Sequence, residues 1–360
     1  MDYELFCIFD NVMDKKSVRF IINPISGTRN KRAIVKLIPQ YLDAERFAYD
    51  MVYTEHSGHA AQLAKEATEE GIDIVVAVGG DGTVNEVARS LVHTKSALAI
   101  IPCGSGNGLA RHLFIPINPI GALKILAECH IEELDYGKIN NQPFFCTCGI
   151  GFDAFISQKF AQAGKRGLMT YVDSTLKEGF NYKPEKYEIN IDGEERTYEA
   201  FLIACANASQ YGNNVFIAPA ASMNDGLMDV TILEPFNAFA APQVVMQLLN
   251  KTIDKNSHTR TFQCRHVHIR RENPGVAHFD GEPMECGRDI DVELISRGVK
   301  IVVNTKQQRI ALPIFSTFND IWEKMSEDIR EDFRQTNERI KRINTELLHK
   351  LKIQEPKNSK

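Results

Sequence analysis

Strand-like apolar runs alternate with amphipathic helical segments through the first hundred residues of the chain. The apolar runs are 17–24, 47–55, 72–78 and 97–102, and the helical segments are 31–43, 59–71 and 83–93. Strands that alternate with helices of this length usually form a parallel sheet with helices on both faces. The alternation therefore predicts a three-layer α/β domain that binds its ligands at the carboxyl ends of the strands.

Three glycine-containing loops follow strands of this predicted sheet. They are INPISG at 22–27, GGDGTVN at 79–85 and PCGSGNGLARH at 102–112. Each loop leads from a strand into a helix, so free backbone N–H groups and the positive end of a helix dipole point outward together. Three such loops at neighbouring strand ends favour an anion site, most simply for a nucleotide polyphosphate. The sequence has no G-x-x-x-x-G-K-[ST] motif, and its GSGNGL lacks the context of a dinucleotide fingerprint.

The chain becomes richer in strand-like segments after the first 137 residues. Region 138–305 carries several alternating runs, with IDGEER at 191–196 as a tight hairpin turn. We expect an antiparallel β-sandwich there. Residues 1–137 form the α/β domain, and we expect 306–330 to complete it.

The last part of the chain, 316–354, contains neither proline nor glycine and repeats its apolar residues at helical spacing. This pattern predicts a C-terminal amphipathic helix. The helix is expected to pack on its own domain or against a second copy of the chain, as in a homodimer. A membrane-surface helix is the alternative, although such helices favour an excess of Lys and Arg on the polar face.

The composition excludes several classes of protein. A net charge of -5 argues against a nucleic-acid partner bound through bulk electrostatics. The eight cysteines lack the paired spacings of a zinc site, which indicates reduced thiols in a cytoplasmic protein. No run approaches the ~20 apolar residues of a transmembrane segment. Any membrane contact is therefore expected to be peripheral, at the inner face.

Six motifs together resemble one enzyme family. NPISG, GGDGTVNEV and GSGNGLARHL, in this order, resemble the catalytic domain of the diacylglycerol kinase and sphingosine kinase family, including its soluble bacterial lipid kinases. GIGFDA, NDGLMDVTIL and HFDGEP resemble the second domain of that family. The resemblance implies a kinase that uses ATP and Mg²⁺ to phosphorylate a hydroxyl of a membrane lipid at the bilayer surface. The lipid would be of the diacylglycerol, sphingoid base or ceramide class.

The same resemblance assigns the ATP site to the glycine loops. The matching positions are Asn23, Pro24, Ile25, Ser26, Gly27, Thr54, Gly79, Gly80, Asp81, Gly82, Thr83, Val84, Asn85, Glu86, Gly104, Ser105, Gly106 and Asn107. The glycines would let the backbone approach the phosphates. Asp81 would hold the Mg²⁺ of ATP or orient the accepting hydroxyl. Glu86 would face the loop or, alternatively, be a solvated carboxylate on the helix surface.

The motif HFDGEP places Asp280 and Glu282 two residues apart. Phosphoryl transfer to an alcohol needs a carboxylate near the accepting hydroxyl to take its proton. By resemblance to the bacterial lipid kinases, Glu282 is the proton acceptor with Asp280 beside it. Resemblance to the sphingosine kinases gives the role to Asp81 instead, and a plain hairpin turn is the structural alternative for DGEP.

The remaining assignments also come from the resemblance. The bacterial members bind a structural Mg²⁺ at a turn like NDGLMD, which corresponds here to Asp225 with Ser222 and Leu227. Without the family, that segment would be a plain Asn-Asp-Gly turn. The candidate lipid-contacting residues are Asp153, Lys165 and Arg166. The spacing of the last two differs from that of the family's phosphate-contacting arginines.

Two other functions compete with a lipid kinase. A kinase of the NAD-kinase type with a soluble substrate would share GGDGT, but GSGN and the long β region count against it. A nucleotide-binding regulator without catalysis would not need the three acidic residues Asp81, Asp280 and Glu282.

Overall fold

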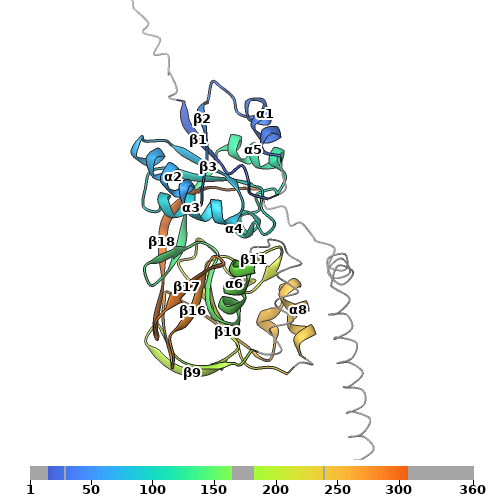
Figure 1. The fold of residues 1–360 in the computed structure, drawn as a ribbon, viewed down its shortest axis with the longest axis vertical. Coiled ribbons are helices and arrows are strands. Elements are labelled where there is room, and N and C mark those ends of the chain that lie inside the picture. The colour runs from blue at the N-terminus through green and yellow to red at the C-terminus, as the bar shows by residue number, and fades with distance from the viewer. Residues whose placement is uncertain (1–14, 28–29, 164–181, 238–239, 307–360) are drawn as a thin grey trace, which may run out of the picture.

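The computed structural model describes residues 15–27, 30–163, 182–237 and 240–306. The strands of the first domain are β1 (Lys16–Ile22), β2 (Phe47–Tyr53), β3 (Ile74–Gly79) and β4 (Ala97–Pro102), paired in parallel in the order β2-β1-β3-β4. The helices are α1 (Lys31–Tyr41), α2 (His59–Glu69), α3 (Asp81–Leu91), α4 (Gly108–His112) and α5 (Pro119–Glu128). Helices α1 and α5 pack together on one face and α2 and α3 on the other (Figure 1). The predicted three-layer α/β domain is confirmed.

The local sequence explains these elements. Every residue of β3 and β4 is buried, as expected for apolar strands covered by helices on both faces. Asn30 starts α1 because its side chain accepts hydrogen bonds from the N–H groups of Arg32 and Ala33. Helix α2 buries a row of alanines, Ala60, Ala64 and Ala67, which lets it lie close to the sheet.

The parallel sheet continues into the second domain. The long strand β18 (Asp289–Val302) pairs in parallel with β4 at Lys300 and Ile301, and it pairs antiparallel with β5 (Ile131–Ile139) and β15 (His266–Arg271). Through β15 the sheet extends to β8 (Glu185–Ile191) and β9 (Glu194–Ala200), and β5 also pairs with β6 (Gln142–Phe144), giving ten strands in all. The alternation seen in the sequence did not reveal that one strand serves both domains.

A second sheet faces this extension. Its six antiparallel strands are, in spatial order, β14 (Thr259–Cys264), β13 (Met228–Leu233), β10 (Leu202–Ala206), β7 (Thr147–Gly151), β16 (Gly275–Phe279) and β17 (Glu282–Cys286). Apolar residues of both sheets form one buried core. The predicted antiparallel β-sandwich is therefore confirmed. The predicted turn between β8 and β9 has positive φ at Asp192 and Gly193, as a two-residue hairpin requires.

The other elements border the sandwich. They are α6 (Phe152–Ala163), the hairpin of β11 (Gln210–Gly212) and β12 (Val215–Phe216), α8 (Ala241–Leu249) and the 3-10 helix η1 (Ile253–Lys255). The predicted helix at 316–354 and the segment 307–330 lie outside the described residues. Within the described ranges, no helix has the length and apolar character needed to cross a membrane.

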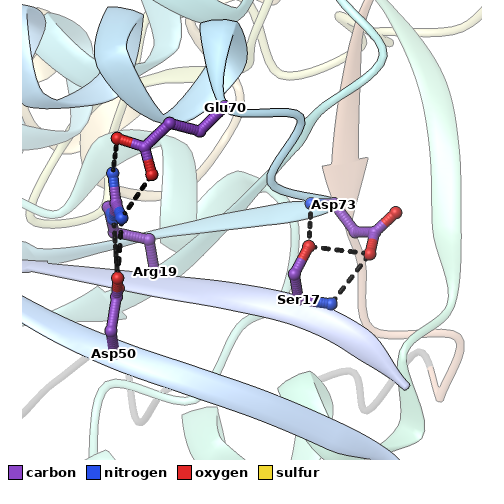
Figure 2. A network of polar contacts seen from close by, with 5 residues as sticks. All are labelled: Ser17, Arg19, Asp50, Glu70 and Asp73. Carbon is purple, nitrogen blue, oxygen red and sulfur yellow. Dashed lines mark hydrogen bonds and ion pairs between the residues drawn. The ribbon is translucent and has the colours of Figure 1, made fainter. Parts of the chain in front are cut away.

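Arg19 joins three elements of the first domain (Figure 2). Its guanidinium on β1 donates hydrogen bonds of 2.7–3.1 Å to Asp50 on β2 and to Glu70 at the end of α2. These bonds raise the pKa of Arg19 far above its usual value, and the bond from Arg19 lowers the pKa of Glu70. Beside them, Asp73 accepts hydrogen bonds from the backbone and side chain of Ser17.

We expect the variant Arg19→Met to lower the thermal unfolding midpoint by roughly 2–5 °C, because it removes the bidentate contacts and leaves two carboxylates side by side. Differential scanning calorimetry measures the midpoint. The control is Arg260→Met, which breaks a contact of 3.0 Å to Glu234 at the domain surface. Equal midpoints for the two variants would contradict the prediction.

Candidate active site between the two domains

The three glycine loops touch one another at the carboxyl ends of β1, β3 and β4. A Cβ atom on Gly27 would lie 1.8 Å from the carbonyl oxygen of Cys103. A Cβ atom on Gly104 would lie 2.8 Å from the Cα atom of Gly80. No side chain fits between backbones at these distances, which explains the glycines. Gly27 also has a φ of +60°, where L residues are strained.

The first turn of α3 faces this junction. Gly80 occupies its N-cap position, and no side chain caps the helix. The first backbone N–H groups and the positive helix end therefore offer an anion site without a competing side chain. Asn23 on the first loop donates a 3.0 Å hydrogen bond to Thr83 Oγ1, which fixes the two loops together. Ile25, at the tip of that loop, is 90% exposed.

The carboxylate of Asp81 faces the third loop. Its Oδ2 accepts a hydrogen bond from Asn107 N at 2.8 Å, and its Oδ1 accepts one from Gly108 N at 2.7 Å. Gly106 passes so close that a Cβ atom would lie 2.8 Å from Asp81 Oδ2. Asp81 thus compensates the unpaired N–H groups at the start of α4, a structural task that sequence reasoning missed.

The other predicted ATP-site residues lie around this junction. Thr54 and Asn85 are buried, whereas Pro24, Gly82 and Ser105 are exposed. Glu86 accepts hydrogen bonds from the N–H groups of Gly58 and Ala60, at 3.0 and 3.1 Å, and so caps α2. Helix α2 has no capping side chain of its own. The interpretation of Glu86 as a solvated surface carboxylate is therefore wrong, because both of its oxygens are bonded to the start of α2.

The turn between β16 and β17 carries Asp280 and Glu282. Asp280 accepts hydrogen bonds from three consecutive N–H groups, those of Phe145, Cys146 and Thr147, at 2.7–3.2 Å. Burial raises the pKa of Asp280 to about 6, although these bonds and the charge of Arg89 act to lower it. Asp280 therefore fixes the turn to the start of β7, with both oxygens occupied.

Glu282 differs from Asp81 and Asp280 in its surroundings. Its side chain is 39% exposed, and its Oε2 lies 3.1 Å from Nη1 of Arg89 on α3. In the part of the chain that the structure describes, no group holds its Oε1. Of the three carboxylates assigned to catalysis, Glu282 is the one with an oxygen available to accept a proton.

Asp153 is buried beneath the turn. Its Oδ2 accepts a hydrogen bond from Tyr211 and faces Nε2 of His278, both at 3.1 Å. The side chains of Asp153 and His278 are only 4% and 2% exposed. His278 Nδ1 in turn accepts a hydrogen bond from Gly281 N, so the buried pair supports the DGE turn, residues 280–282. Asp153 does not reach the surface in this arrangement, and Lys165 and Arg166 lie outside the described residues.

The loop before β13 carries the predicted metal ligands Ser222, Asp225 and Leu227. Asp225 is exposed and accepts a hydrogen bond from Leu227 N at 3.0 Å, which forms a local turn. Nearby, Oδ2 of Asp229 is buried without a hydrogen-bond partner. One carboxylate with carbonyl oxygens suits a hard cation such as Mg²⁺. No group of three His, Cys, Asp or Glu side chains within the described ranges forms a metal site, so this loop would rely on carbonyls.

The hairpin β11–β12 of the second domain contacts the third glycine loop. Asn213 N donates to Gly106 O at 3.1 Å, and Arg111 Nη1 lies 3.5 Å from Asn214 Oδ1. Both asparagines have positive φ, a conformation that asparagine tolerates better than most residues. The sequence YGNN is the only signal for this contact, and it was not recognised.

Two family models match the chain. The model described as "Diacylglycerol kinase catalytic domain" matches residues 17–139, and "YegS C-terminal NAD kinase beta sandwich-like domain" matches residues 147–302. A Chromohalobacter salexigens protein named "Probable lipid kinase YegS-like" is 31% identical over 236 residues, which cover 64% of this chain and 76% of that protein. The chain belongs to the YegS-like and diacylglycerol kinase family.

Other members of this lipid kinase family agree with that result. A Bacillus subtilis protein named diacylglycerol kinase is 27% identical over 272 residues, which cover 74% of this chain and 90% of that protein. A solved structure of a diacylglycerol kinase from Bacillus anthracis has a TM-score of 0.63 at 20% identity, covering 81% of this chain and 98% of that one. The structural likeness shows the shared fold. As a member of this family the chain is a kinase, and kinases of this family use ATP.

His112, at the end of α4, links the first domain to Ser209 and makes the folding stability depend on pH. Its Nδ1 lies 3.1 Å from both N and Oγ of Ser209, and burial lowers its pKa to about 4. The pKa of this histidine in the unfolded chain is about 6.5, so between pH 6.5 and pH 4 its imidazole binds a proton mainly in the unfolded chain. Stability is therefore lost as the pH falls through this window, by about 2 kcal/mol at pH 5.

The variant His112→Asn keeps an acceptor for Ser209 N but does not titrate. We expect its stability deficit relative to the wild type to shrink by about 2 kcal/mol between pH 7.5 and pH 5. Urea unfolding at both pH values measures this difference. Asp280 titrates with the opposite sign but is present in both proteins, so its contribution cancels. A constant deficit would refute the neutral, buried imidazole.

Proposed function

We propose that the chain is an ATP- and Mg²⁺-dependent lipid kinase that transfers the γ-phosphoryl group of ATP to a hydroxyl of a membrane lipid. One observation carries the proposal. Glu282, a carboxylate with an available oxygen, contacts Arg89 in the last turn of α3, the helix whose uncapped first turn offers an anion site. Phosphoryl transfer to an alcohol requires both a phosphate site and a proton acceptor for the hydroxyl, and here one helix connects the two candidates.

The glycine loops would bind the phosphates of ATP. Gly80 and Gly104 let the second and third loops pack backbone to backbone at the start of α3, and the free N–H groups there would donate to phosphate oxygens. Asn23 and Thr83 would set the distance between the first and second loops. Asp81 would keep the third loop in place through Asn107 and Gly108. The two N–H groups that donate to its carboxylate would offset the negative charge that the phosphates meet.

Two roles are proposed for Mg²⁺. Bound with ATP, the ion offsets the negative charge of the phosphates. A second, structural ion would be held by Asp225 and by carbonyl oxygens of Ser222 and Leu227. The buried and unpartnered Oδ2 of Asp229 supports a cation or water in that region.

Glu282 would act as the general base. The lipid hydroxyl gives its proton to the Glu282 carboxylate while its oxygen forms a bond to the γ-phosphorus, and the bond from that phosphorus to the β-phosphate oxygen breaks to release ADP. Asp280 holds the turn through the N–H groups of Phe145, Cys146 and Thr147, and the buried Asp153–His278 pair supports it. This arrangement favours Glu282 over Asp81 and Asp280 as the base.

The second domain is proposed to receive the lipid. The head would enter between the domains and the acyl chain would lie in the β-sandwich domain. Relatives named diacylglycerol kinase make diacylglycerol the first substrate to test, followed by sphingoid bases and ceramide. A cytoplasmic enzyme that meets the inner membrane face peripherally, as a monomer or a homodimer, fits this proposal.

The decisive assay offers labelled ATP and Mg²⁺ with each lipid in mixed micelles, and with NAD in a separate reaction. We expect label on at least one lipid alcohol. Label on NAD alone would support the soluble-substrate alternative and reject the lipid kinase. ATP binding without transfer to any acceptor would support a non-catalytic regulator.

We expect Glu282→Gln to lower kcat by about 10²- to 10⁴-fold while the Kd for ATP stays within about twofold, because the variant loses the proton acceptor but no nucleotide contact. Steady-state kinetics and isothermal titration calorimetry measure the two quantities. Glu285→Gln, on the same strand and exposed, is the matched control and should keep wild-type activity. Full activity of Glu282→Gln would move the base to Asp81.

The structural Mg²⁺ proposal has a readout that does not depend on activity. We expect added Mg²⁺ to raise the thermal midpoint of the wild type, since an ion that binds the folded state stabilises it. The variant Asp225→Ala should lose at least about half of that increase. Asp254→Ala, which removes a carboxylate from η1 instead, should retain it. An unchanged increase in Asp225→Ala would remove this loop from consideration as the site.

A further inference from the structure

Arg89 connects the phosphate-loop helix to the second domain. It lies two turns after Asp81 on α3, and its Nη1 donates to Glu282 Oε2 at 3.1 Å. The carbon at the centre of its guanidinium lies 4.6 Å from the ring centroid of Phe279. Phe279 and Glu282 flank the two turn residues Asp280 and Gly281, at the end of β16 and the start of β17. One side chain from the first domain thus contacts the turn on both sides.

Folding stability alone does not explain an arginine at this position. The Arg89 side chain is only 20% exposed, and its Nε and Nη2 are buried without a hydrogen-bond partner in the described part of the chain. A buried guanidinium that leaves two nitrogens unpaired costs free energy, and an apolar residue of similar length would avoid that cost. A role in the chemistry of its partner is the simpler account.

The contact constrains the one carboxylate of the turn that is free to react. Glu282 has three rotatable side-chain bonds and a half-exposed carboxylate, so without a partner it would sample several rotamers. Arg89 takes Oε2 and leaves Oε1 open. The Phe279 ring holds the guanidinium itself in place through a cation–π contact. A general base is effective only when its oxygen lies within hydrogen-bond reach of the proton.

We propose that Arg89 is a positioning residue, which holds Glu282 so that Oε1 faces the lipid hydroxyl. Because Arg89 belongs to α3, the same helix orients both the phosphates of ATP and the base, and the distance between them is fixed across the domain boundary. This inference rests on the proposed function, since it takes Glu282 as the base. Arg89 as a direct ligand of a phosphate group is the competing role, and the test separates the two.

The test compares Arg89→Met and Arg89→Lys with the wild type, measuring kcat and the KM values for ATP and lipid. We expect Arg89→Met to lower kcat by about 10- to 100-fold with both KM values within about twofold, because ligand binding is kept and orientation is lost. Arg89→Lys keeps the charge and should recover kcat to within about fivefold of the wild type. Arg260→Met, which breaks the contact to Glu234, is the matched control and should be fully active.

A double variant shows whether Arg89 acts through Glu282. In the Glu282→Gln background, Arg89→Met should change kcat by less than about twofold, because the group that it orients is already lost. A further loss as large as in the wild-type background would overturn the proposal. Thermal unfolding of each variant identifies loss of fold, and if Arg89→Met does not fold, Arg89→Gln carries the same expectation.

Other outcomes are also decisive. An unchanged kcat in a folded Arg89→Met variant would overturn the positioning role alone. A KM for ATP or lipid raised more than about tenfold at unchanged kcat would assign Arg89 to ligand binding instead. A wild-type chain that phosphorylates no lipid would reject the proposed function, and the role of Arg89 with it.

Discussion

The two hydrogen bonds that Asp81 accepts from Asn107 and Gly108 hold the candidate site together. They join the second glycine loop to the third, and they satisfy N–H groups at the start of α4 that no side chain of that helix caps. They also explain how the proposed phosphate-binding loop tolerates a carboxylate. The backbone N–H groups that bond to Asp81 offset the negative charge of its carboxylate, so the N-terminus of α3 remains suited to anions.

From Asp81 a series of contacts passes through both domains and returns to α3. The third loop accepts a hydrogen bond from Asn213, whose hairpin also carries Tyr211. Tyr211 donates to Asp153, and Asp153 and His278 support the DGE turn. Glu282 then returns the series to the first domain through Arg89. Because the contacts form a closed ring, a displacement of either domain would shift the glycine loops and Glu282 together.

Sequence reasoning predicted what depends on local pattern. Apolar periodicity gave the strands and helices of the first domain, and glycines before helices marked the loops that meet at its edge. It missed what depends on contacts between distant segments. The capping of α2 by Glu86, the anchoring of Asp280 on three N–H groups and the burial of Asp153 against Tyr211 and His278 all involve partners that only the fold brings together. An acidic residue in a motif looks the same in the sequence whether its oxygens are free or occupied.

Strand β18 has a consequence for how the chain folds during synthesis. Its residue Lys300 pairs with Ala97, about two hundred residues earlier in the chain. Until the ribosome has made β18, the edge of β4 has no neighbouring strand, and exposed edges of this kind readily pair with other chains. The first domain cannot complete its sheet before almost all of the second has been translated. Contacts of such long range slow folding, and an unpaired edge of this kind exposes a nascent chain to aggregation until the pairing strand is made.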